Sequence, residues 1–192
     1  MAPSGSGKTT LLRLMNRIEQ ADSGTIEGLP KRIGTVFQED RLCEEYDVIT
    51  NIMLIMKCKY YKKQSGKKEY NKKAISKREN NINETKHSRK AVSETIKKEA
   101  SRILPEECLT KKASELSGGM RRRCAILRAL LSDSELIIMD EPFTGLDDEN
   151  RRKTAEYILD NLNGRTLIVT THREEDVELL GAVKVDLEAV QL

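Results

Sequence analysis

A glycine-rich loop close to the first residue constrains this chain more than any other feature. Residues 2–10 read Ala-Pro-Ser-Gly-Ser-Gly-Lys-Thr-Thr and lead into an apolar run. Glycines can take positive φ, so successive backbone N–H groups can turn toward phosphate oxygens. A flexible surface turn is the plainer interpretation, but Lys-Thr-Thr ahead of an apolar run disfavours it. The loop therefore predicts nucleotide triphosphate binding by Ser4, Gly5, Ser6, Gly7, Lys8, Thr9 and Thr10.

Two adjacent acids at the end of an apolar segment form a second candidate site. The run Leu-Ile-Ile-Met at residues 136–139 reads as a buried parallel strand, which by itself indicates only core. Ligand sites of open α/β sheets lie at the carboxyl ends of strands, and Asp140 stands there as a candidate Mg²⁺ ligand beside the Thr9 hydroxyl. Glu141 would then polarise an attacking water as a general base.

A Ser-Gly-Gly sequence precedes a basic helix at residues 117–130. Ser117 can cap this helix, and a capped helix end with free N–H groups at Gly118 and Gly119 can bind an anion. A basic run such as residues 121–123 usually lies on a solvated or subunit-facing surface, and we expect it there rather than on nucleic acid.

Five ordered motifs together resemble the ATP-binding cassette (ABC) ATPases. Residues 116–120 are similar to the family's signature motif, residues 136–142 to Walker B, residues 145–147 to the D-loop, residues 36–40 to the Q-loop and residues 169–172 to the H-loop. The resemblance implies ATP and Mg²⁺ as cofactors, with Thr9, Gln38 and Asp140 organising the metal. It also implies catalytic roles for Glu141, His172 and Gln38, and contact of Ser117, Gly118 and Gly119 with ATP held by a second subunit.

Within the family, the Q-loop and signature look most like the ATPase subunits of nitrate, sulfonate and taurine importers. Met120 in place of the commoner Gln belongs to that likeness, whereas residues 43–46 depart from it. The resemblance implies transmembrane permease subunits as partners, a second cassette in a homodimer, indirect contact with a substrate-binding protein, and a place on the cytoplasmic face of the membrane. Two alternatives remain: an ATP-dependent switch in DNA repair or chromosome organisation, and an inactive cassette fragment.

The implied fold is α/β, a P-loop NTPase with a mostly parallel core sheet and an α-helical subdomain. We expect one domain over residues 1–192, with core at 1–46 and 118–192 and the helical subdomain at 47–117. The family's strand ahead of the phosphate loop and its antiparallel β subdomain are expected to be missing. No stretch approaches the roughly 18 apolar residues of a membrane span.

The net charge of +3 hides an uneven distribution. Residues 57–100 carry 15 basic and 5 acidic side chains. Their centre, residues 61–90, is rich in Lys, Asn, Glu and Ser and poor in aliphatic residues, so it cannot bury enough apolar surface to pack firmly. We interpret it as a surface insertion in the helical subdomain. The four cysteines lack Cys-x-x-Cys spacing, which favours reduced thiols over a metal site.

Periodicity and capping residues predict the remaining elements. Helices are expected over residues 8–20, from Val48 with Asp47 as cap, over 92–104, over 148–162 and from Glu174. Strands are expected over residues 32–37, 166–170 and 183–187.

Overall fold

The computed structural model describes residues 7–65 and 90–185, and the side chains of residues 57–65 are outside this description. The helices are α1 (Lys8–Met15), α2 (Val48–Ser65), α4 (Gly118–Leu130), α5 (Asp148–Asp160) and α6 (Glu174–Leu180), and residues 90–100 are also helical. The strands are β1 (Ile33–Val36), β2 (Leu136–Asp140) and β3 (Thr166–Thr170), and the short 3₁₀ turns are η1 (Glu106–Cys108) and η2 (Ala113–Glu115).

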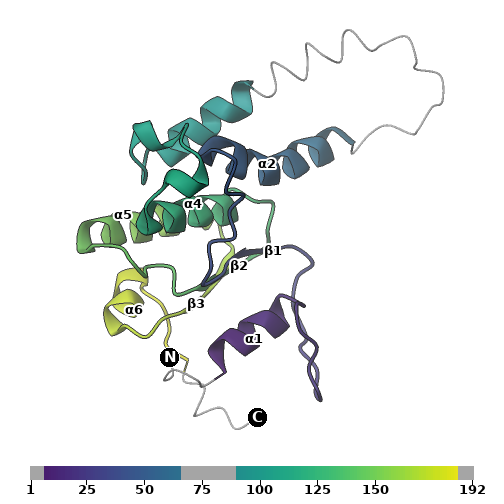
Figure 1. The fold of residues 1–192 in the computed structure, drawn as a ribbon. Coiled ribbons are helices and arrows are strands. Elements are labelled where there is room, and N and C mark those ends of the chain that lie inside the picture. The colour runs from purple at the N-terminus through teal and green to yellow at the C-terminus, as the bar shows by residue number, and fades with distance from the viewer. Residues whose placement is uncertain (1–6, 66–89, 186–192) are drawn as a thin grey trace, which may run out of the picture.

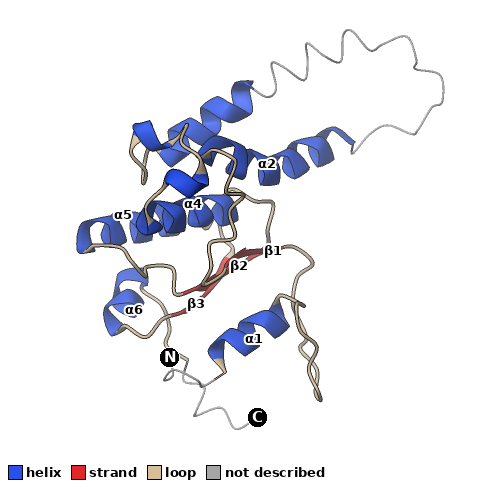
Figure 2. Ribbon diagram, in the orientation of Figure 1, coloured by secondary structure: helices blue, strands red, loops and turns tan. Residues whose placement is uncertain are grey.

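The three described strands form one parallel sheet in the order β1-β2-β3 (Figure 2). Met139 of β2 is in register with Val36 on one side and with Val169 on the other. This alignment places the carboxyl ends of all three strands at one edge, where ligand sites of α/β sheets lie. The α/β class with a parallel sheet, predicted from the sequence, is confirmed.

Both faces of β2 are buried because helices cover the sheet on both sides. Successive strand residues point to opposite faces. Leu136 and Ile138 pack with Leu12 of α1, whereas Ile137 and Met139 join the larger core beneath α4 and α5 (Figure 1). An apolar run without alternation is therefore what this strand requires.

Gly34 of β1 allows the close approach of α4 to the sheet. A Cβ atom at this position would lie 2.9 Å from the Ala129 carbonyl oxygen and 2.9 Å from the Ser134 hydroxyl oxygen. No larger side chain fits without moving backbone.

The helical part of the chain packs on α4 and shares the larger core, through buried residues that include Val48, Ile52, Ile96 and Ala100. Polar contacts fix the backbone at residues 43–51, where the chain enters α2. The Thr50 amide donates to Asp47 Oδ1 at 2.6 Å, which confirms Asp47 as the cap of α2. The buried Asn51 side chain accepts from the Cys43 amide and donates to three carbonyls of residues 43–47.

Several element boundaries differ from the sequence expectation. The first helix ends at Met15 rather than near residue 20, and residues 183–185, expected to begin a strand, have no regular structure. Residues 61–65 of the predicted insertion continue α2, and residues 66–89 lie outside the described residues. None of the described helices combines the length and apolarity that crossing a membrane requires.

Candidate functional site

The phosphate loop enters the described structure at Gly7. This residue has φ 83°, in the left-handed region, and α1 begins immediately after it at Lys8. The predicted turn into a helix is therefore present at the expected residue, with the first amides of α1 forming a positive helix end. Thr10 is exposed on this first turn. The predicted residues Ser4, Gly5 and Ser6 lie outside the described residues.

Asp140 ends β2, and its side chain contacts the first turn of α1 at the edge of the sheet. Its carboxylate accepts a hydrogen bond from the Thr9 hydroxyl at 3.3 Å and another from the Thr170 hydroxyl. The residue is only 6% exposed. Two residues that lie 131 positions apart in the sequence thus meet, as their expected shared role at a metal requires.

A small cavity brings Gln38 to the same pair. Thr9, Gln38 and Asp140 line it together with Phe37 and Arg41, and its volume is about 50 Å³. This space admits a small ion or a water and is far too small for a triphosphate. A hydroxyl, a carboxylate and an amide oxygen form an all-oxygen donor set, which is the chemistry that Mg²⁺ prefers. The donor set therefore fits this cofactor.

Glu141 lies next along the chain and faces a second cavity of about 180 Å³. Its backbone has φ 47°, unusual for a residue with a side chain, while its amide donates to the Thr170 carbonyl at 3.0 Å. One carboxylate oxygen lies 3.5 Å from His172 Nδ1, and the other accepts from the Thr144 hydroxyl at 3.2 Å. The structure thus brings both predicted groups to one corner, defined here as the Glu141–His172 corner.

A buried ion pair between Asp176 and Arg151, which the sequence analysis missed, supports the backbone next to this corner. Asp176 Oδ2 accepts from the Thr171 hydroxyl at 2.5 Å, and Asp176 Oδ1 lies 3.8 Å from Arg151 Nε. Thr171 is the neighbour of His172, so the pair fixes the backbone that carries the histidine. The only sequence signal for this pair is the acid Asp176 in the first turn of α6. Acids at that position are usually explained by a favourable interaction with the helix dipole, so the pair is easily overlooked.

The predicted signature residues lie elsewhere. Ser117 caps α4 by accepting from the Met120 amide at 3.4 Å, and both Ser117 and Gly118 are exposed. Gly119 packs on the D-loop, where an added Cβ would lie 3.1 Å from the Gly145 carbonyl oxygen. These three residues line neither cavity.

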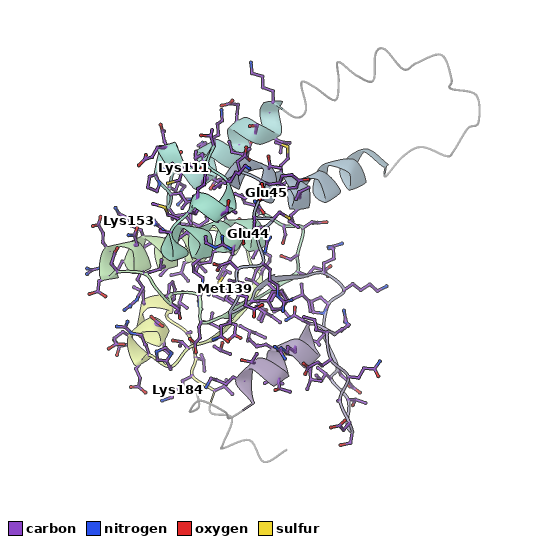
Figure 3. The ribbon with its side chains drawn as sticks, viewed as in Figure 1. Glu44, Glu45, Lys111, Met139, Lys153 and Lys184 are labelled. Atoms are coloured by element: carbon purple, nitrogen blue, oxygen red, sulfur yellow. The ribbon has the colours of Figure 1, made fainter. Side chains whose placement is uncertain are left out.

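The expectation of a surface position is wrong for Arg122 and Arg123, whereas Arg121 is partly exposed. Arg122 is 6% and Arg123 8% exposed, and Arg121 donates to the carboxylate of Glu44 beside α4 (Figure 3). Arg123 Nη1 donates to the Ile103 carbonyl and to Asn150 Oδ1 at 2.6 Å. The charges of Arg122 and Arg123 can be buried because backbone and side-chain oxygens accept hydrogen bonds from their guanidiniums.

Burial changes the pKa of Asp40 beside α4 and of Cys124 on α4. Burial raises the pKa of Asp40 above its ordinary value, although Arg122, Arg121 and Arg128 oppose the shift. Burial also raises the pKa of the Cys124 thiol to about 12, so this thiol stays protonated and unreactive. Neither group belongs to the two cavities.

Comparisons with known proteins agree with this geometry. The family model described as ABC transporter matches residues 1–144. The Nod factor export ATP-binding protein I of Cupriavidus metallidurans is 31% identical over 192 residues, covering 94% of this chain and 55% of that protein. The protein of the same name from Rhizobium etli is 33% identical over 192 residues, covering 94% and 52%. The chain spans about half the length of these curated relatives.

Solved structures show the same fold. A dimeric ATP-binding cassette in a post-hydrolysis state, bound to ADP and Pi, superposes with a TM-score of 0.69 at 26% identity, covering 93% of this chain and 75% of that one. A dimeric bacterial ABC transporter cassette gives a TM-score of 0.69 at 25% identity with the same coverage. The nitrate, sulfonate and taurine importer subtype suggested by the Q-loop and signature is not confirmed, because the relatives above are named as exporters.

Proposed function

The chain belongs to the ABC transporter family, and on that premise we propose that it binds ATP with Mg²⁺ and hydrolyses it as the nucleotide-binding cassette of a transporter. One observation carries the proposal. The Thr9 hydroxyl contacts the Asp140 carboxylate, in a cavity that Gln38 also lines, beside the corner where Glu141 meets His172. Groups from three strand ends and the phosphate loop thus converge on one edge of the sheet.

Each residue has a proposed role in hydrolysis. Gly7 and the first amides of α1, with Lys8, would bind the phosphates, and Ser4, Gly5, Ser6 and Thr10 would complete that loop. Thr9, Gln38 and Asp140 would hold Mg²⁺, which when bound supplies charge neutralisation on the phosphate oxygens.

The Glu141–His172 corner would perform the proton and charge handling. Glu141 would orient the attacking water and accept its proton, and the hydrogen bond from Thr144 holds its second oxygen in place. His172 would contact the γ-phosphate, stabilising charge that develops there. The open side of this corner leaves room for the substrate, since the His172 side chain is 64% exposed.

We further propose that Ser117, Gly118 and Gly119 act on ATP held by a second cassette. Ser117 and Gly118 are exposed, and none of the three residues lines either cavity, which supports a role between subunits. Related cassettes have been solved as dimers. The proposed partners are a second copy of the cassette and transmembrane permease subunits, at the inner face of the membrane. The names of the relatives favour export over the import that the motifs suggested.

The proposed division of the chain follows the same premise. Residues 1–46 and 118–192 would form the core that carries both cavities, and residues 47–117 the helical subdomain. The capping of α2 by Asp47 supports a boundary at that point.

Glu141→Gln tests the proposed chemistry. In the full-length protein, this variant should bind ATP and accumulate as an ATP-bound dimer, while Mg²⁺-dependent ATPase turnover falls by about 10² to 10⁴-fold, the usual contribution of a general base. Phosphate release and size-exclusion chromatography with ATP measure the two effects. Glu149→Gln is the matched control, because that exposed carboxylate pairs only with Lys153 in the described contacts. Unchanged turnover in Glu141→Gln would remove Glu141 from the mechanism, and a wild type without Mg²⁺-dependent hydrolysis would refute the function.

A further inference from the structure

Two arginines of α4 bind the backbone of the Q-loop. Arg122 donates to the Phe37 carbonyl at 2.6 Å and to the Gln38 carbonyl. Arg128 donates to the Asp40 carbonyl at 2.9 Å and to the Arg41 carbonyl at 2.7 Å. Four of the five carbonyls in residues 37–41 are therefore held by guanidinium groups from one helix. We call Arg122 and Arg128 the arginine clamp.

The clamp uses properties specific to arginine. A guanidinium presents a rigid planar fork of donors, so one side chain can bridge two carbonyls, which an ammonium group holds less firmly. Arg122 is buried, and its Nη1 also lies 3.3 Å from Asp40 Oδ1, so that the carboxylate compensates its charge. Charge-assisted hydrogen bonds of this kind are stronger than neutral ones.

Among the described contacts, the clamp binds the backbone of Gln38 and not its side chain. The Gln38 carbonyl is bound to Arg122, while its side chain lines the cavity shared with Thr9 and Asp140. Gln38 itself is exposed and follows the last residue of β1 by two positions, so neither burial nor the sheet fixes it. The contacts that fix its backbone come from α4.

We propose that Arg122 and Arg128 are positioning residues that hold Gln38 at the metal-binding cavity, and that they tie this cavity to the helix whose first residues form the signature motif. The inference rests on the proposed function of Gln38. It adds a link within one chain between the cavity and α4, which begins at Gly118.

A double-mutant cycle on the full-length protein tests the link. Arg122→Gln should raise the Mg²⁺ concentration for half-maximal ATPase activity by about tenfold, with a smaller change in ATP binding measured without Mg²⁺. In a Gln38→Ala background, Arg122→Gln should add less than about a twofold shift, because the residue that it positions is gone. Arg122→Lys should recover only part of the loss, since it keeps the charge but not the fork. An equal shift in both backgrounds would overturn the proposal.

Arg165→Gln is the matched control. Arg165 is a half-buried guanidinium that, like Arg122, bonds several carbonyls, those of Leu130, Asn161 and Leu162, but it lies at the opposite end of β3 from the site. Its loss should lower stability without altering the Mg²⁺ requirement. A comparable Mg²⁺ shift in Arg165→Gln would show that the effect reports destabilisation, and the proposal would fail.

Hydrogen–deuterium exchange provides a measurement that does not depend on catalysis. Arg122→Gln should accelerate exchange in a peptide covering residues 37–43 and leave residues 166–170 unchanged, and Arg165→Gln should do the reverse. If Arg122→Gln does not fold, Arg128→Gln is measured in the same way, because Arg128 is less buried. Unchanged exchange at 37–43 in a folded variant would overturn the clamp even if the wild type hydrolyses ATP. A wild type without ATPase activity would contradict the proposed function alone.

Discussion

The Q-loop and the Glu141–His172 corner lie at the same edge of the sheet but are built in opposite ways. The Q-loop backbone is held at 2.6 to 2.9 Å by the guanidiniums of buried Arg122 and half-buried Arg128. At the corner, the nearest Glu141 oxygen is 3.5 Å from His172 Nδ1, and the histidine side chain is 64% exposed. The protein thus fixes one side of the site internally and leaves the other side open for what binds there.

The difference teaches where stability and activity should separate. A buried, charge-assisted network contributes to folding, because breaking it leaves unpaired polar groups in the interior. An exposed group with loose contacts contributes little to folding and can be reserved for the ligand. Even at the corner the buried support is one step away, in Thr171, Asp176 and Arg151.

His172→Ala should produce the largest contrast between the two regions. ATPase turnover should fall on the order of a hundredfold, the usual cost of losing one donor to developing charge. The free energy of unfolding should change by less than about 0.5 kcal/mol, because the side chain is exposed. Steady-state turnover and urea denaturation measure the two quantities. Lys153→Ala is the control and should leave both near wild type, because this exposed cation of α5 pairs with Glu149 and lines neither cavity. A large loss of stability in His172→Ala would contradict the contrast.

Arg123→Met should have the opposite effect. The substitution leaves the Ile103 carbonyl and Asn150 Oδ1 without their donor in a buried place. Burial lowers the pKa of Arg123, but its guanidinium stays charged in the wild type. Methionine has no N–H donor, so the variant loses these hydrogen bonds entirely. Unfolding free energy should fall by about 2 kcal/mol, measured by urea denaturation.

Arg152→Met serves as the control for Arg123→Met, because Arg152 is exposed on α5 and bonds only the Asp148 carbonyl in the described contacts. Equal losses of stability in the two variants would mean that burial on α4 does not distinguish them.

Deleting residues 66–89 and joining Ser65 to Lys90 with a short Gly-Ser linker should have the smallest effect. This prediction follows from composition, since the segment is rich in Lys and Asn and poor in aliphatic residues. ATPase turnover should stay within about twofold and unfolding free energy within about 0.5 kcal/mol of wild type. A cooperative loss of folding would show that the segment packs as part of the helical subdomain.

Sequence reasoning succeeded where the cause is local. Helix α1 begins at Lys8 because Gly7 can take the left-handed turn before it, and α2 begins after Asp47 because that carboxylate caps it. Strand β3 spans Thr166–Thr170, the residues predicted from their β-branched and apolar composition. The meeting of Thr9, Gln38 and Asp140 followed from the family resemblance, and their roles and those of the corner stay predictions.

The arginines of α4 show what local reasoning misses. Residues 121–123 read as a charged surface run, yet Arg122 is buried against carbonyls more than 80 positions earlier in the chain. The Asp176–Arg151 pair was missed for the same reason, because an acid in a first helical turn reads as an ordinary dipole contact.

The sequence by itself determined the turn at Gly7 into α1, the caps, the strand that ends in Asp140, and the α/β class. These features depend on backbone dihedral preferences and on hydrogen bonds to positions three or four residues away, which are set by neighbours in the chain. Only the tertiary structure decided which charges are buried and which acids support the corner. Whether a guanidinium faces water or a carbonyl depends on segments that the sheet brings together, and no spacing within one helix encodes that approach.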